Sequence, residues 1–193
     1  TTHDMNDPAV WAKVEELIDI GNLIDYWVAE SFVTNNDIAM NCRFFQHPEV
    51  ADGRWRYVLY DMDYSMYNVY VNYYSFATDP GGLQKGQAPS TLLRTLMRSD
   101  VFREQFVQRV AYQLNNIWTY ENLKARMDAI SAVIAPEMPR NQARWGLTMS
   151  DWYTGLERLE RFSKNRPKVM VSQTRSYFGL SAERTQELFG EVV

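Results

Sequence analysis

Two short runs of this chain, residues 43 to 46 and 54 to 60, are rich in aromatic and other β-favouring residues and are separated by a turn. Before and after these runs, apolar residues recur at the spacing of amphipathic helices. One pair of strands among helices cannot build the alternating β/α sheet of a doubly wound enzyme. The pattern therefore predicts a mainly α fold of the α+β type, a helical bundle with one small β-hairpin, formed as a single domain by residues 1–193.

Capping residues and apolar spacing predict the individual elements. A helix over residues 8–20 opens at Asp7-Pro8, and a second, capped by Asn22, reaches the polar cluster at 34–37. Strands 43–46 and 54–60 form the hairpin, and a long loop follows over 64–88. Five further helices are expected: from Pro89, from Ser99, from Thr119, from Ser150 to Asn165, and from Pro167 to near Gly179.

Composition excludes several classes of protein. The hydrophobic share of 46% is that of a packed globular domain, and no run of about 18 apolar residues could span a membrane. Residues 1 to 63 carry 12 acidic against 4 basic side chains, which disfavours nucleic acid as a partner. A single cysteine excludes an internal disulfide. Three tryptophans are expected in the core: Trp11, Trp27 and Trp152.

Polar side chains flank the predicted hairpin on both sides. Asp37 and Asn41 precede it, and Asp61 and Asp63 follow it. In an antiparallel pair these positions lie at the same end, with the strands about 4.8 Å apart. Hard oxygen ligands of this kind suit Mg²⁺ or Mn²⁺ with the phosphates of a nucleotide, and a carboxylate left free of the metal can accept a proton from a hydroxyl. The alternative is that these residues serve only as caps and turns.

The Asp61-Met62-Asp63 motif has three enzymatic interpretations. Haloacid-dehalogenase-type phosphatases and many glycosyltransferases use such a pair, but both need a β/α sheet. An EF-hand fails because Met66 and Asn72 stand where Gly and Glu are required. The order Asp37, Asn41, hairpin, Asp61 instead reproduces the parts of a protein-kinase C-terminal lobe.

Long segments of the chain resemble the spore-coat-protein-H (CotH) kinase family. They are NLIDYWVAESFVTNNDIAMNCRFF, GRWRYVLYDMDYSMY, LLRTLMRSDVFREQFVQRV and FSKNRPKVM. The resemblance implies an atypical kinase that uses ATP with Mg²⁺ or Mn²⁺ to phosphorylate Ser/Thr of a secreted or coat protein, at an extracellular, cell-surface or spore-coat location. It implies Asp37 as the catalytic residue, Asp61 and Asn41 as cofactor-binding residues, and Asp61, Asn41 and Asp63 as metal ligands.

Two features depart from the kinase pattern. Asp37 and Asn41 are four residues apart, whereas the general signature has five. No Gly-rich loop or Lys-bearing strand precedes residue 22, so the N-terminal lobe that clamps the nucleotide is expected elsewhere in a longer chain. Residues 1–193 alone are therefore expected to bind metal-nucleotide weakly and to turn over little or nothing. The competing hypothesis is a non-catalytic surface or coat scaffold with a structural acidic cluster.

The remaining polar and aromatic residues are expected to be structural. Cys42 is predicted to be buried and His47 to be solvated. The five tyrosines between 64 and 74 are predicted to pack the long loop onto the bundle. A solvated basic helix face is predicted to contain Arg158, Arg161, Lys164, Arg166 and Lys168.

Overall fold

The structure is a computed structural model that describes residues 3–37, 41–81 and 86–192. It is mainly helical with a small two-stranded antiparallel sheet, as the sequence predicts. The α-helices and strands are α1 Pro8–Leu17, α2 Ile20–Val33, β1 Arg43–Phe45, β2 Arg56–Val58, α4 Tyr73–Thr78, α5 Ala88–Leu96, α6 Asp100–Asn116, α7 Tyr120–Ile134, α8 Met138–Arg144, α9 Met149–Phe178 and α10 Ala182–Phe189.

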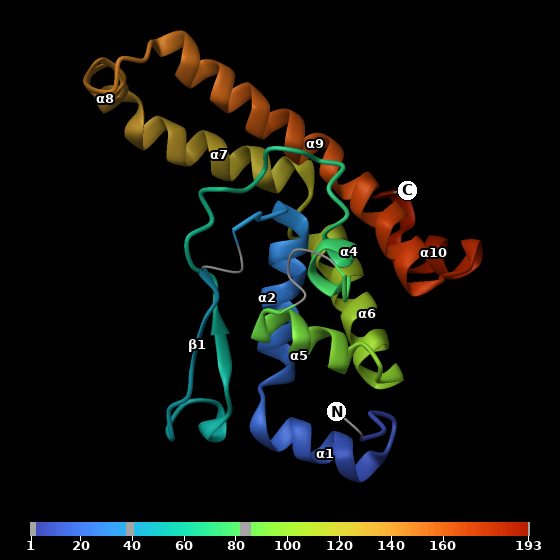
Figure 1. Cartoon of the computed structure of the whole chain (residues 1–193). Helices are drawn as coiled ribbons and strands as arrows, with labels where there is room; N and C mark the ends of the chain where they lie inside the picture. The colour runs from blue at the N-terminus through green and yellow to red at the C-terminus, as the bar shows by residue number, and fades with distance from the viewer. Residues whose placement is uncertain (1–2, 38–40, 82–85, 193) are drawn as a thin grey trace.

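Helix α2 is the central element. Figure 1 shows it between the hairpin on one side and α6 on the other, and it also packs against α4 and α9. Ten of its residues are buried. The core that it organises is aromatic and aliphatic, with Phe32 stacked on Trp118 and edge-on to Phe162. Large buried residues of this core are Leu23, Trp27, Phe102, Phe106, Leu114 and Phe189.

The junction between α1 and α2 differs from the prediction. The first helix ends at Leu17 because Ile18 is extended and pairs with Trp55. The cap of α2 is Asp19, whose side chain accepts from the backbone N–H of Asn22. Asn22, the predicted cap, instead bonds both backbone groups of Tyr57, at 2.6 and 3.2 Å. The hairpin is thereby fixed to the first turn of α2.

Strands β1 and β2 form the predicted hairpin but are shorter than expected. Their register pairs Arg43 with Val58 and Phe45 with Arg56. The backbone N–H of Trp55 donates to Leu17 O at 2.8 Å, which ties the hairpin to the end of α1. Both strand ends that lead toward Asn41 and Asp61 consequently lie at one end of the hairpin, and the turn around Asp52 lies at the other.

The predicted long loop contains a helix. Asn72 caps α4 by accepting from the N–H of Ser75. Tyr73 and Tyr74 on this helix are buried, and Tyr74 Oη lies 2.8 Å from Thr174 Oγ1 of α9. The other three tyrosines of the segment, Tyr64, Tyr67 and Tyr70, are exposed. The predicted packing of this segment onto the bundle therefore holds only for its helical part.

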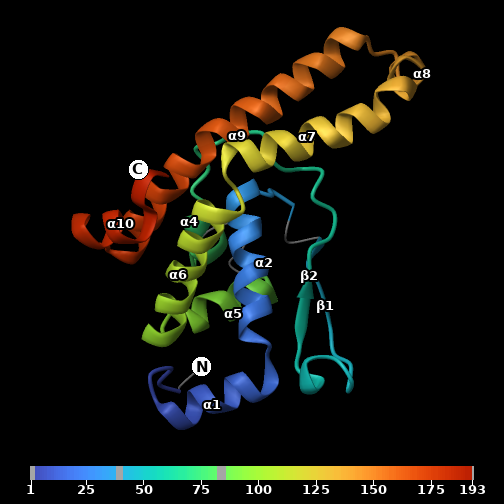
Figure 2. The same ribbon diagram turned by 180° about the vertical axis from the view of Figure 1, so that it is seen from behind.

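Helix α9 continues through Pro167, where the sequence predicts a break. The helix is held there by tertiary contacts of neighbouring residues, which outweigh the local penalty of proline. Figures 1 and 2 show α7 and α9 running side by side toward α8, so that they form a projecting arm, defined here as residues 120–164. Helices α8 and α10 were not predicted. Trp11 and Trp27 are buried as predicted, whereas Trp152, within the arm, is only half-buried.

Candidate functional site

The segment that follows α2 lies beside the segment that follows β2. Helix α2 ends at Thr34, which adopts a left-handed conformation (φ 54°). Beyond it, the backbone N–H of Asn36 donates to Tyr64 O at 3.2 Å, and that of Met66 donates to Val33 O at 2.7 Å. These bonds bring the residues around Asp37 next to those around Asp61 and Asp63.

Asn35 links the two segments through its side chain. It is 1% exposed, and its Oδ1 accepts from the backbone N–H of Asp37 at 3.0 Å. Its Nδ2 lies 3.6 Å from the Sδ atom of Met62, the residue between Asp61 and Asp63. No signal in the sequence distinguishes Asn35 from its polar neighbours, because a polar residue after a helix is ordinarily a solvated turn residue.

Asp37 and Asn41 are brought together as predicted. Asp37 is half-buried, and Asn41 Nδ2 donates to its Oδ2 at 2.9 Å. This bond fixes the orientation of the carboxylate. Residues 38–40, which separate the two, lie outside the described residues.

Asp61 and Asp63 are exposed, and Asp61 adopts a left-handed conformation (φ 54°). The pKa of the Asp61 carboxyl is raised from its ordinary value. Desolvation is the first cause, followed by the charge of Asp63 and a hydrogen bond with it, and then by the charge of Asp37, while Arg43 acts in the opposite direction. The charges of Asp63 and Asp37 therefore both disfavour the ionised form of Asp61 at this end of the hairpin, and a cation there would stabilise it.

Arg166 binds the backbone at the end of α2 that leads into this site. The prediction that this residue lies on a solvated helix face is wrong. It is 0% exposed and donates to the backbone oxygens of Ser31 and Phe32, at 2.6 and 2.9 Å. It also donates to the backbone oxygens of Val69 and Val71. The guanidinium thus binds the C-terminal end of α2, where the helix dipole is negative.

Comparison with models of protein families shows to which family the chain belongs. A family model described as CotH kinase protein matches residues 2–170. The chain belongs to the CotH kinase family. Comparison with curated proteins and with solved structures gives no match. Membership indicates kinase function with general use of nucleotide and divalent metal, and the CotH family is associated with the spore coat. No helix in the described part of this CotH chain is long and apolar enough to cross a membrane.

The donor set of this CotH protein can be tested against a metal ion. Over residues 3–37, 41–81 and 86–192, no three His, Cys, Asp or Glu side chains gather closely enough to hold a metal by themselves. Asp61 and Asp63 form a close carboxylate pair, with the amide of Asn41 bonded to Asp37 nearby. Mg²⁺ typically takes one or two carboxylates and completes its shell with phosphates and water. The residues therefore fit a metal-nucleotide better than a bare metal ion.

A buried polar cluster lies at the base of the CotH site. Its members come from α2, from the residue after the α2 C-cap, from the residue before β1 and from α4: Tyr26, Glu30, Asn35, Cys42 and Tyr73. Burial raises the pKa of Glu30 to about 7, although Tyr26, Asn35 and Tyr73 act in the opposite direction. Burial likewise raises the pKa of the half-buried Cys42 thiol and of the two tyrosines. A lone Glu within a helix carries no sequence signal for such a cluster.

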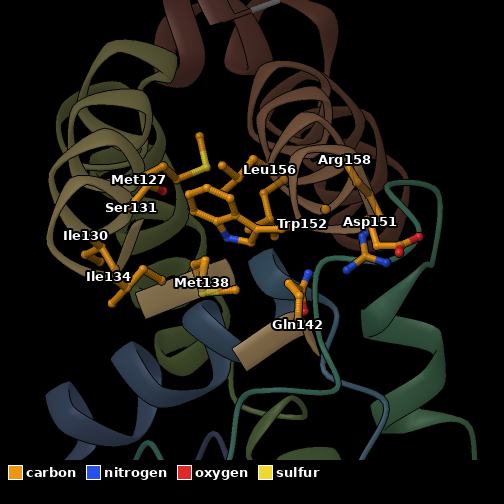
Figure 3. Close-up of a pocket in the computed structure, with 12 residues that line it drawn as sticks. Met127, Ile130, Ser131, Ile134, Met138, Gln142, Asp151, Trp152, Leu156 and Arg158 are labelled. Atoms are coloured by element: carbon orange, nitrogen blue, oxygen red, sulfur yellow. The ribbon is translucent and has the colours of Figure 1, made fainter. Parts of the chain in front are cut away.

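A hollow of about 420 Å³ lies within the arm of the CotH protein (Figure 3). Its wall is mostly apolar and includes Met127, Met138 and Trp152. Neither Asp37, Asn41, Asp61 nor Asp63 lines it. An apolar wall of this kind does not suit the triphosphate of a nucleotide, so the candidate site remains the end of the hairpin.

Proposed function

We propose that residues 1–193 form the C-terminal lobe of an atypical CotH-type protein kinase, which transfers phosphoryl from metal-ATP to Ser/Thr of a secreted or coat protein. The observation that carries the proposal is the position of Asp37 within electrostatic reach of Asp61, on adjacent segments at one end of the hairpin. Family membership supports phosphoryl transfer as the reaction.

Asp37 would act as the catalytic residue. Its Oδ2 accepts from Asn41, which fixes the carboxylate plane. A substrate Ser/Thr hydroxyl bound to the other oxygen would be oriented toward the γ-phosphorus. The hydroxyl oxygen forms the new P–O bond, its proton passes to Asp37, and the bond to the β-phosphate oxygen breaks to release ADP.

Asp61 would hold the divalent metal on ATP, with Asp63 as a second ligand and Asn41 as an amide ligand. Bound Mg²⁺ or Mn²⁺ would neutralise charge on the phosphates. The raised pKa of Asp61 supports this role, because carboxylates that repel each other gain most from a cation.

The N-terminal lobe of the same chain is the proposed partner that clamps the nucleotide. Exposed apolar side chains on the hairpin, Phe44, Val58 and Tyr60, offer it a surface. Positioning supplies much of the catalysis in phosphoryl transfer, so we expect residues 1–193 alone to be nearly inactive. By family, the proposed location is extracellular, cell-surface or spore coat.

Calorimetric titration with Mn²⁺·ATP tests the proposal. Asp61→Asn should weaken binding about 10-fold or more, because it removes a metal-binding charge. Asp37→Asn should change binding little, yet lower transfer by the full-length kinase about 100-fold or more. Asp52→Asn is the matched control, since this exposed residue lies in the turn at the far end of the hairpin. Equal affinity of Asp61→Asn, Asp52→Asn and wild type would rule the proposal out.

The competing function is a non-catalytic scaffold, and the arm provides the observation that favours it. Ile130, Val133 and Trp145 are 63%, 79% and 67% exposed there. All three side chains belong to the arm, and exposed apolar surface can serve as an interaction site. The same titration distinguishes the two functions. If the acidic cluster is only structural, the wild-type protein should bind Mn²⁺·ATP no more tightly than the Asp61→Asn variant.

A further inference from the structure

We propose that a groove between the loop after β2 and helix α9 binds anionic side chains, carboxylate or phosphoserine, that flank the Ser/Thr acceptor of the protein substrate. This loop-arm groove has a volume of about 370 Å³, and its wall includes Tyr67, Tyr70, Arg158, Arg161 and Asn165. Its role in substrate choice rests on the proposed kinase function. The binding of an anionic peptide does not, and it is tested separately.

The first observation is that the two arginines of the groove have no acid bound to them. Among the described residues, neither Arg158 nor Arg161 forms an ion pair. The Nε atom of Arg158 is also buried there without a hydrogen-bond partner, which is rare for a donor in a native protein. Arginine binds carboxylates and phosphates through parallel N–H donors, so these two groups offer a site for an anion.

The acidic residues of α9 near these arginines are engaged elsewhere or lie outside the groove. Asp151 lines the hollow of the arm beside one of the arginines (Figure 3), but its Oδ2 accepts from the backbone N–H and the hydroxyl of Thr148. Glu160 Oε1 accepts from the hydroxyl of Tyr120 at 2.7 Å. Glu157 does not line the groove. The groove is therefore a positively charged surface on a chain of net charge −4.

The second observation is that the loop wall of the groove is held in place. The guanidinium of Arg158 lies over the ring of Tyr67, 4.3 Å from its centroid. Behind the loop, Arg166 donates to the backbone oxygens of Val69 and Val71, at 2.6 and 3.3 Å. Because the wall is already ordered, an incoming side chain loses little free energy to ordering it.

The third observation places the groove next to the candidate site. The loop begins directly after Asp63, and the rings of Tyr64 and Tyr67 lie 5.5 Å apart. Tyr64 O accepts from the backbone N–H of Asn36, the residue before Asp37. Figure 1 shows the loop leaving the end of the hairpin and reaching α9. A substrate whose hydroxyl lies at Asp37 can therefore place a neighbouring side chain in the groove.

The charges of the two surfaces are opposite, and this gives the substrate a direction. The carboxylates of Asp61 and Asp63 at the end of the hairpin repel an anionic side chain, whereas Arg158 and Arg161 attract it. Clusters of arginine are a recurrent means of recognising acidic and phosphorylated peptides. The basic residues of α9 that line the groove are thus more than a solvated helix face.

Fluorescence anisotropy with residues 1–193, without ATP or metal, tests the binding step. Three labelled peptides share a central serine and differ only in the residues that flank it, which are glutamate, phosphoserine or glutamine. We expect the glutamate or the phosphoserine peptide to bind about 10-fold more tightly than the glutamine peptide, and the tighter of the two identifies the source of the anion. Added NaCl should weaken this preference.

Substitutions of the arginines show whether the groove is the site. Arg158→Gln and Arg161→Gln should each reduce the preference for anionic peptides about 3-fold or more, and the double variant should abolish it. Arg140→Gln removes the same charge from an exposed residue of α8 and is the matched control, which should keep the preference. Equal affinity for all three peptides, or an equal loss in Arg140→Gln, would overturn the proposal. A loss of Mn²⁺·ATP affinity in Arg158→Gln as large as the loss of peptide affinity would assign the groove to the nucleotide and overturn it as well.

Transfer by the full-length kinase tests the role in substrate choice. The preferred anionic peptide should have a lower KM than the glutamine peptide, and Arg158→Gln should remove this difference. A difference that persists in Arg158→Gln would overturn that role. Absence of transfer to every peptide, with the binding preference of residues 1–193 intact, would refute the kinase function and leave the groove as an anionic-peptide site.

Discussion

At the scale of single residues, Arg166 shows how a buried charge can be held without an acid. No carboxylate in the described part of the chain forms an ion pair with it. Its donors instead satisfy carbonyl oxygens at the end of α2 and of the loop at 69–71, together with Gln173 Oε1 at 3.1 Å. Burial lowers its pKa to about 10, which keeps the guanidinium charged at neutral pH.

Arg166→Met should destabilise the protein by about 3 kcal/mol, because several buried carbonyl oxygens lose their donors. Urea unfolding measures the loss. Arg161→Met on the exposed face of the same helix is the control and should cost less than about 0.5 kcal/mol. Similar losses for the two variants would mean that Arg166 does not anchor α2.

Glu30 also makes the stability of the protein depend on pH. In the folded state its pKa is about 7, whereas its ordinary value is 4.5. As the pH rises from 4.5 to 7, the unfolded chain releases this proton and the folded protein keeps it, so the free energy of unfolding falls by about 3 kcal/mol. Below pH 4.5 Glu30 is protonated in both the folded and the unfolded state, so it does not lower the free energy of unfolding there.

Urea unfolding of wild type and Glu30→Gln at pH 5 and pH 8 measures this effect. From pH 5 to pH 8, the free energy of unfolding of Glu30→Gln should rise by about 2 to 3 kcal/mol relative to that of wild type, because only the wild type must ionise a buried carboxyl. Glu16→Gln, which changes an exposed residue of α1, is the control. A stability difference that is the same at both pH values would show that Glu30 does not titrate in this range.

At the scale of elements, local signals predicted the helices whose ends are set by local bonds. Asp7, Ser99 and Thr119 cap α1, α6 and α7 as expected, since an N-cap bond depends only on neighbouring residues. The hairpin places the residues before β1 and after β2 at one end, but the approach of Asp37 to Asp61 depends on bonds between segments, from Asn36 N–H to Tyr64 O and from Met66 N–H to Val33 O. The use of Asp37 and Asp61 in catalysis and metal binding stays a prediction.

Distant contacts decided the elements that local signals missed. Asn22 would cap a helix by itself, but it bonds Tyr57, 35 residues away, and Asp19 takes the cap. Arg166 binds Phe32 across 134 residues of sequence, and its burial is why the helix around Pro167 stays continuous. No periodicity in a single sequence encodes such pairs.

The docking of the hairpin on α2 gives a prediction at this scale. Asn22→Ala removes both bonds to Tyr57 and should cost about 1 to 2 kcal/mol. Hydrogen exchange of the Tyr57 amide should accelerate at least 10-fold. Asn116→Ala, which removes only a bond within α6, is the comparison and should leave Tyr57 unaffected. Unchanged exchange at Tyr57 in Asn22→Ala would show that other contacts hold the hairpin.

At the scale of the whole molecule, the site lies where separate parts of the chain meet. The end of α2, the entry to β1 and the exit from β2 converge beside the base of the arm, and Arg166 and Asn35 tie them together (Figures 1 and 2). At the acidic end of the hairpin Asp61 and Asp63 are exposed, as access for a nucleotide requires. The central claim is that this end receives a metal-nucleotide.

Broadening of NMR signals by substoichiometric Mn²⁺, with and without ATP, tests that claim most directly. With ATP present, the amide signals of Asp37, Asp61 and Asp63 should broaden at Mn²⁺ levels that leave Asp52 sharp, because the acidic end of the hairpin holds the ion and the turn does not. Without ATP the same signals should broaden much less, since the donor set is completed by phosphates. Signals of Asp37 and Asp61 that stay sharp with Mn²⁺·ATP, or that broaden no earlier than that of Asp52, would contradict the account.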